Sequence, residues 1–80
     1  MKDHDIINKR TEQIITAFKN KDLDLDDLRD LTWYYLHRHI MASYYLRSES
    51  NHKSQRKYIV DSALFLAHLK ALTTINGEGE

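Results

Sequence analysis

The chain has 80 residues, with 12 basic and 12 acidic side chains and neither cysteine nor proline. A domain of this length buries only about 60% of the surface that its unfolded form exposes, so it needs a good core or a partner. The composition excludes disulfides, thiolate metal ligands and a thiol nucleophile, and the balanced charge gives no overall bias toward nucleic acid or acidic membranes.

The absence of proline, with glycine only at Gly77 and Gly79, favours long helices over tight hairpin turns. We therefore predict one all-α domain over residues 1–80. The charged N-terminus lacks the apolar segment of a signal peptide, and no stretch approaches the roughly 20 apolar residues that span a bilayer. We expect a soluble, cytoplasmic protein that does not bind membranes.

The first predicted helix spans residues 6–19, with Asp3 or Asp5 as its N-cap. It is amphipathic, because its apolar positions recur on one face at about 100° per residue. That face holds Ile7, Thr11, Ile14 and Phe18. The segment that follows breaks the pattern, and Asp24 with Asp27 three residues later resembles a variant capping arrangement for the next helix.

The second predicted helix spans residues 25–47 and would be about 35 Å long. Apolar or aromatic residues cover nearly every direction around its axis, whereas a surface helix keeps one polar face. The large apolar and aromatic side chains of this helix include Trp33, Tyr34, Ile40, Met41, Tyr44 and Tyr45. This pattern is typical of a central helix that is covered on several sides.

A polar connection precedes the third predicted helix, which spans residues 55–74. Ser50, Asn51 or Ser54 is expected to cap it, and the helix should stop before Asn76 and Gly77, where glycine supplies a left-handed residue. Residues 76–80 are expected to form a loose tail.

The third helix carries alanines at four-residue spacing, Ala63, Ala67 and Ala71. Such a run leaves a shallow groove where another helix can approach closely. The occupant is either another helix of the same chain or a partner molecule.

We expect an antiparallel three-helix bundle that self-associates through its second and third helices. Three helices can each hide one broad face in a shared core, and these two helices carry more apolar surface than that. Each large side chain left exposed forgoes about 1.5–3 kcal/mol, and a contiguous patch promotes association. The predicted interface residues are Trp33, Tyr34, Ile40, Met41, Tyr44, Tyr45, Ala63, Ala67 and Ala71.

The histidines do not predict a metal site or a cofactor. His37 and His39 are two residues apart and point about 200° from each other on a helix, so they cannot bind one metal together. We expect His39 to be hydrogen-bonded between helices. Asp61 and His68 share a helix face, and Lys57 lies one turn before Asp61, which indicates a Lys57–Asp61 ion pair rather than a catalytic set.

Arg47 and His52 have the spacing Arg-x4-His at a helix junction. This resembles the Arg-x4-6-His motif of HEPN ribonuclease domains, in which an arginine and a histidine from two subunits act on RNA. The resemblance covers only these six residues. It implies a remote alternative in which Arg47 and His52 cleave RNA.

The basic segment of the chain is a second alternative site. Its cations are Arg47, Lys53, Arg56 and Lys57, which could neutralise phosphates while nearby tyrosines stack on bases. No zinc-finger or RNP-like signature accompanies them. Our main prediction is a protein-binding module, such as an adaptor, inhibitor or regulatory accessory, that acts as a homo-oligomer or on a larger protein; the alternative is a nucleic-acid-binding regulator.

Overall fold

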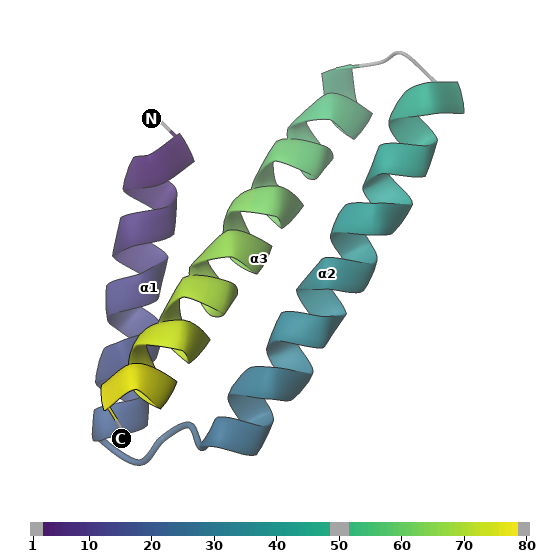
Figure 1. Cartoon of the computed structure of the whole chain (residues 1–80). Coiled ribbons are helices and arrows are strands. Elements are labelled where there is room, and N and C mark those ends of the chain that lie inside the picture. Colours follow the sequence, from purple (N-terminus) through teal and green to yellow (C-terminus); the bar gives the residue numbers. More distant parts are fainter. Residues whose placement is uncertain (1–2, 49–51, 79–80) are drawn as a thin grey trace.

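A computed structural model describes the backbone of residues 3–48 and 52–78 and the side chains of residues 4–44 and 55–77. It contains three helices, α1 (Asp3–Lys19), α2 (Leu25–Ser48) and α3 (His52–Glu78), and the described residues form no strand (Figure 1). The prediction of an all-α three-helix bundle is confirmed.

The ends of the helices differ from the predicted ones at several points. α1 begins at Asp3, so Asp5 lies inside the helix and does not cap it. α3 begins at His52, which places Ser54 within the helix, and Ser50 and Asn51 lie outside the described residues. α3 also continues through Gly77, which has no positive φ, because no proline or left-handed residue interrupts it.

The connection between α1 and α2 is held by local hydrogen bonds. Lys21 has a φ of 63°, and the amides of Lys21 and Asp22 donate to the carbonyls of Phe18 (3.1 Å) and Ala17 (2.9 Å). This is a Schellman motif with a lysine in the left-handed position. Asp24 then caps α2, because its Oδ1 accepts a hydrogen bond of 2.8 Å from the amide of Asp27, which confirms the predicted capping pair.

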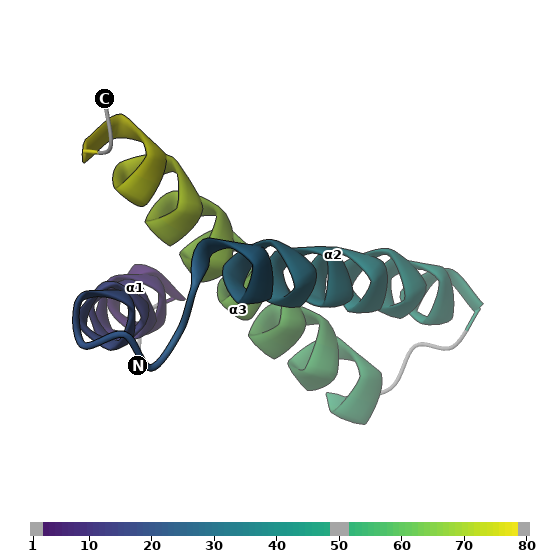
Figure 2. The same ribbon diagram turned by 90° about the horizontal axis from the view of Figure 1, so that it is seen from below.

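The three helices are arranged with α3 in the middle, so the prediction that the second helix is the central one is wrong. α1 and α2 both pack on α3, on opposite sides of it, and make little contact with each other (Figures 1 and 2). α2 and α3 run antiparallel. The chain extends 43 × 25 × 20 Å with a radius of gyration of 13.8 Å, against about 12 Å for a compact domain of this length. The bundle is therefore elongated and open.

The core is small and depends on the close approach of α1 to α3. Its buried cluster consists of Ile14, Leu28, Ala67, Ala71 and Ile75. The Thr11 hydroxyl donates to Ile7 O at 2.6 Å and lies 3.4 Å from Ala67 O, so α1 lies directly over the alanine run. The occupant of the groove in this structure is thus a helix of the same chain.

Candidate protein interface

The inward face of α3 is small and polar. Ala63, Ala67 and Ala71 are almost fully buried, and so are Asp61 and His68. The alanines are covered within the chain, and they do not contribute to the exposed surface. On other sides of the helix, Leu66 and Leu69 are exposed.

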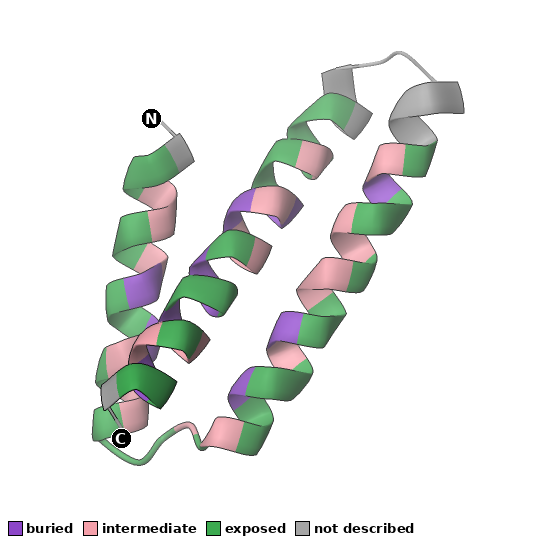
Figure 3. Cartoon of the chain, viewed as in Figure 1, coloured by how far each residue is buried: buried purple, intermediate pink, exposed green. Residues whose placement is uncertain are grey.

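Large apolar side chains lie exposed on α2 and α3. Figure 3 shows exposed positions along both helices. On α2 they are five of the predicted interface residues, with Trp33 exposed by 70%; the set is Trp33, Tyr34, Ile40, Met41 and Tyr44. The side chain of the sixth, Tyr45, lies outside the described residues. On α3 the exposed set is Ile59, Val60, Leu66 and Leu69. These four residues are not among the interface residues predicted from the sequence.

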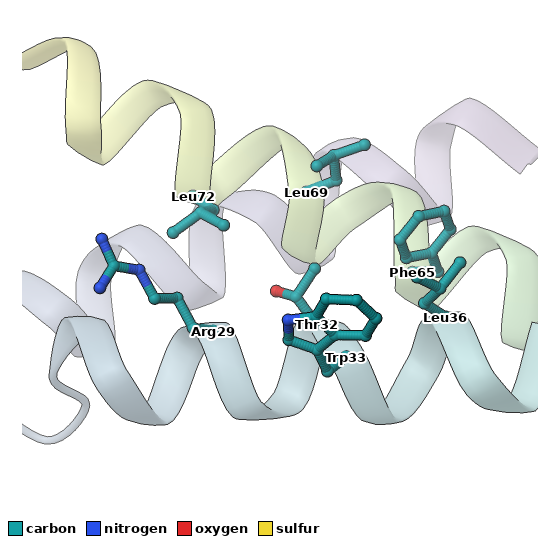
Figure 4. A pocket seen from close by; sticks show the side chains of 7 residues that line it. All are labelled: Arg29, Thr32, Trp33, Leu36, Phe65, Leu69 and Leu72. Carbon is teal, nitrogen blue, oxygen red and sulfur yellow. The ribbon is translucent and has the colours of Figure 1, made fainter.

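An open groove between α2 and α3 brings part of this surface together. It has a volume of about 250 Å³ and is lined by Arg29, Thr32, Trp33, Leu36, Phe65, Leu69 and Leu72 (Figure 4). We call it the Trp33 groove. Its lining is almost wholly apolar, since the Thr32 hydroxyl donates to Leu28 O at 2.7 Å and Arg29 stands at one end.

The Trp33 groove faces away from α1. On α3 the groove residues Leu69 and Leu72 lie on the side of the helix opposite Ala67 and Ala71. No residue of α1 lines the groove. The packing of α1 therefore leaves this apolar face uncovered.

A second hollow lies further along α3, toward its N-terminus. It has a volume of about 290 Å³ and its lining includes Ile7, His39, Ile59 and Leu66. Leu66 and the groove residue Leu69 are three residues apart, so they are neighbours on the surface of α3. Unlike the Trp33 groove, this hollow is bounded on one side by Ile7 of α1.

Polar contacts between α2 and α3 lie beside this surface and hold the two helices in register. His39 Nδ1 is 2.7 Å from Ser62 Oγ, and the His39 ring stacks on Tyr58 and Phe65. His39 is therefore hydrogen-bonded between helices, as expected from its position on α2. A histidine held in this way fixes the position of α2 on α3.

Asp61 does not pair with Lys57, in contrast to the prediction. Its Oδ1 lies 3.4 Å from Nε of Arg38 on α2, while Lys57 is exposed. The reason is that Asp61 faces α2, so a cation from the neighbouring helix reaches it. The hydrogen bond from Arg38 Nη1 to the Tyr34 hydroxyl (2.9 Å) and the charge of Asp61 raise the pKa of Arg38 above its ordinary value.

His68 is fully buried on α3, with its ring 4.9 Å from the ring of Tyr35. Neither ring nitrogen has a hydrogen-bond partner among the described residues. Burial, and then the positive charge of Arg10, lower the pKa of His68 to about 4. At neutral pH this histidine is an uncharged part of the core.

The structure tests the other candidate sites only in part. Arg56 and Lys57 are exposed at the start of α3. The side chains of Arg47, His52 and Lys53 lie outside the described residues. They include both residues of the ribonuclease alternative and two of the four predicted nucleic-acid contacts. Within the described part of the chain, no three His, Cys, Asp or Glu side chains come together as a metal site.

One segment of α3 is more apolar than expected. Residues Gln55–Gly77 are long and apolar enough to cross a membrane by length and composition, with a mean hydropathy of 1.2. This differs from the expectation that no stretch approaches such a span. Asp61 and His68 lie within the segment and are buried against the other helices, and a core helix of a soluble protein meets the same criterion. The apolarity follows from inward alanines combined with outward leucines.

Comparison of the chain with protein-family models, curated proteins and solved structures finds no match.

Proposed function

We propose that the chain is a protein-binding module that acts through the apolar face of α2 and α3. The observation that carries the proposal is the Trp33 groove, an open apolar hollow with a 70% exposed tryptophan on its wall. Contiguous exposed apolar surface of this kind marks interaction sites in soluble proteins. Tryptophan is also among the residues that dominate binding energy when a partner covers them.

The surroundings of the groove support a binding role rather than catalysis. The polar groups nearest to it are used within the chain: His39 contacts Ser62, Arg38 pairs with Asp61, and His68 is buried. A partner therefore meets mainly side chains of leucine, phenylalanine and tryptophan. An adaptor, inhibitor or regulatory accessory requires a surface of this kind and no reacting groups.

Photo-crosslinking tests this proposal. A benzoylphenylalanine residue replaces Trp33 in one variant and Gln13, an exposed residue of α1, in the control. We expect irradiation in the cell that produces the chain to give protein adducts of defined mass from position 33 and none from position 13. Absence of adducts at position 33, or equal labelling at both positions, would contradict a binding role for the α2–α3 face.

A further inference from the structure

His68 is a polar side chain in a place where an apolar one would pack better. It is fully buried, and neither of its ring nitrogens has a hydrogen-bond partner among the described residues. Nε of Arg10 is buried without a partner as well. An unpaired polar group in a core costs free energy that a leucine in the same position would not. Natural proteins break such packing rules most often at functional sites, so His68 calls for a role other than stability.

Each helix brings a different group to the His68 ring. α1 brings the guanidinium of Arg10, whose positive charge contributes to the lowered pKa of His68. α2 brings the ring of Tyr35, with 4.9 Å between the two ring centroids. On α3 itself, Asp61 lies on the same face about two turns earlier, where its carboxylate is paired with Arg38 of α2. The charged groups of the described residues on this side of α3 are therefore Arg10 and, further from the ring, the Arg38–Asp61 pair.

Protonation of His68 acts unequally on the two neighbouring helices. Like charges repel, so a positive charge on the ring weakens the packing of α1, which carries Arg10. A cation within about 6 Å of an aromatic ring centroid is attracted to the ring, so the contact with Tyr35 of α2 is kept. The 2.7 Å contact between His39 and Ser62 also ties α2 to α3. Because α1 makes little contact with α2, it can leave α3 without separating the other two helices.

We propose that His68 is an acid-sensitive switch for the position of α1: its protonation releases α1 from α3, while α2 and α3 remain packed together. Release admits water to the charged ring and separates it from Arg10, which removes both causes that oppose its protonation. Release also uncovers the side of α3 formed by Ala63, Ala67 and Ala71, over which α1 lies at neutral pH. The chain therefore presents a different surface in acid.

The two protonation equilibria of His68 set the direction and the size of the effect. With α1 packed on α3 the pKa of His68 is about 4, and in the released state the exposed ring has the ordinary value of 6.5. The released state therefore binds more protons, so the packing of α1 weakens as pH falls below 6.5 and is weakest below about pH 4. The whole difference is about 300-fold in the packing equilibrium, of which about 20-fold falls between pH 7 and pH 5.

Thiol labelling measures the release of α1, because the native chain has no cysteine. Ala67→Cys places a thiol beneath α1, and Gln13→Cys places one on the exposed face of α1. The ratio of their labelling rates with a maleimide at low concentration cancels the effect of pH on the thiol itself. We expect this ratio to rise about 20-fold from pH 7 to pH 5. Ala71→Cys, a second buried position on the alanine side, should show the same rise, and far-UV circular dichroism checks that each variant is helical.

Two matched substitutions assign the rise to His68. In the Ala67→Cys chain, His68→Leu should give the same labelling ratio at pH 7 and pH 5. His37→Leu, the same change at an exposed histidine of α2, should keep the rise of about 20-fold. A rise that persists in His68→Leu overturns the proposal, and so does a ratio that is independent of pH when His68 is present.

A thiol on α2 separates the release of α1 from unfolding of the whole chain. Ala42 is buried on α2, which packs mainly on α3. If α1 leaves alone, Ala67→Cys should be labelled at least about tenfold faster than Ala42→Cys at pH 5, because local opening is more frequent than global unfolding. Equal labelling at the two positions shows that the three helices open together, and it refutes a switch that acts on α1.

Discussion

Acidification should destabilise the fold through His68. The unfolded chain has an ordinary histidine pKa of 6.5, whereas burial and the charge of Arg10 lower the pKa of His68 to about 4 in the folded state. Between these values the unfolded chain binds more protons, so stability falls as pH falls below 6.5 and this contribution is lost completely below about pH 4. A difference of about 2.5 pKa units corresponds to about 3 kcal/mol, of which about 2 kcal/mol is lost between pH 7 and pH 5.

Urea unfolding at pH 7 and pH 5, followed by far-UV circular dichroism at one chain concentration, measures this effect. His68→Leu removes the titrating group and should reduce the loss of unfolding free energy between the two pH values by about 2 kcal/mol relative to the native chain. His4→Gln, which removes an exposed histidine of α1, is the matched control and should keep the native pH dependence. If the native chain and His68→Leu lose equal stability, burial of a neutral His68 is not what the acid perturbs.

Three further substitutions test the packing and capping contacts by urea unfolding. Asp24→Ala removes the cap on the Asp27 amide and should cost about 1 kcal/mol, whereas no loss would show that the cap is dispensable. Ala67→Leu should cost about 1–3 kcal/mol or more, because α1 lies directly over this residue; native stability would contradict that close approach. Arg38→Met should destabilise the chain by leaving buried Asp61 without its cation, and adding Asp61→Leu should recover most of the loss; a double variant no more stable than Arg38→Met would refute this pairing.

The sequence predicts the three helices well because their signals are local. Periodicity, the absence of proline and the Asp24–Asp27 cap depend on neighbours within a few residues, and α2 begins at the predicted Leu25. The errors at helix ends have the same origin. Lys21 adopts the left-handed conformation at the end of α1, whereas Gly77, the expected left-handed residue, continues α3.

The orientation of α3 could not be predicted from its composition. Its alanine side and its leucine side are both apolar, so periodicity does not distinguish the inward face from the outward face. The choice depends on close packing of α1 on Ala67 and Ala71, which is a tertiary effect. Once that side is inward, Leu66 and Leu69 are exposed, and periodicity alone does not predict their exposure.

The polar pairs show the same division between local and tertiary effects. A lysine one turn before Asp61 suggested a pair along the helix, but the cation that reaches Asp61 is Arg38, 23 residues earlier in the chain. His39 was placed between helices by its position on a helix face, and its partner Ser62 was not predicted. On the candidate surface, the exposure of Trp33, Tyr34, Ile40 and Met41 was anticipated because α2 has more apolar directions than two neighbours can cover.

The central position of α3 has a consequence for synthesis of the chain. α1 and α2 are made first, yet each packs mainly on α3, which is the last of the three helices to be synthesised. A nascent chain that ends before α3 holds two helices without their packing surface, and helices of this length are marginal alone in water. Tertiary structure must therefore wait until α3 has left the ribosome, and a chain interrupted within α3 leaves both earlier helices exposed to proteolysis.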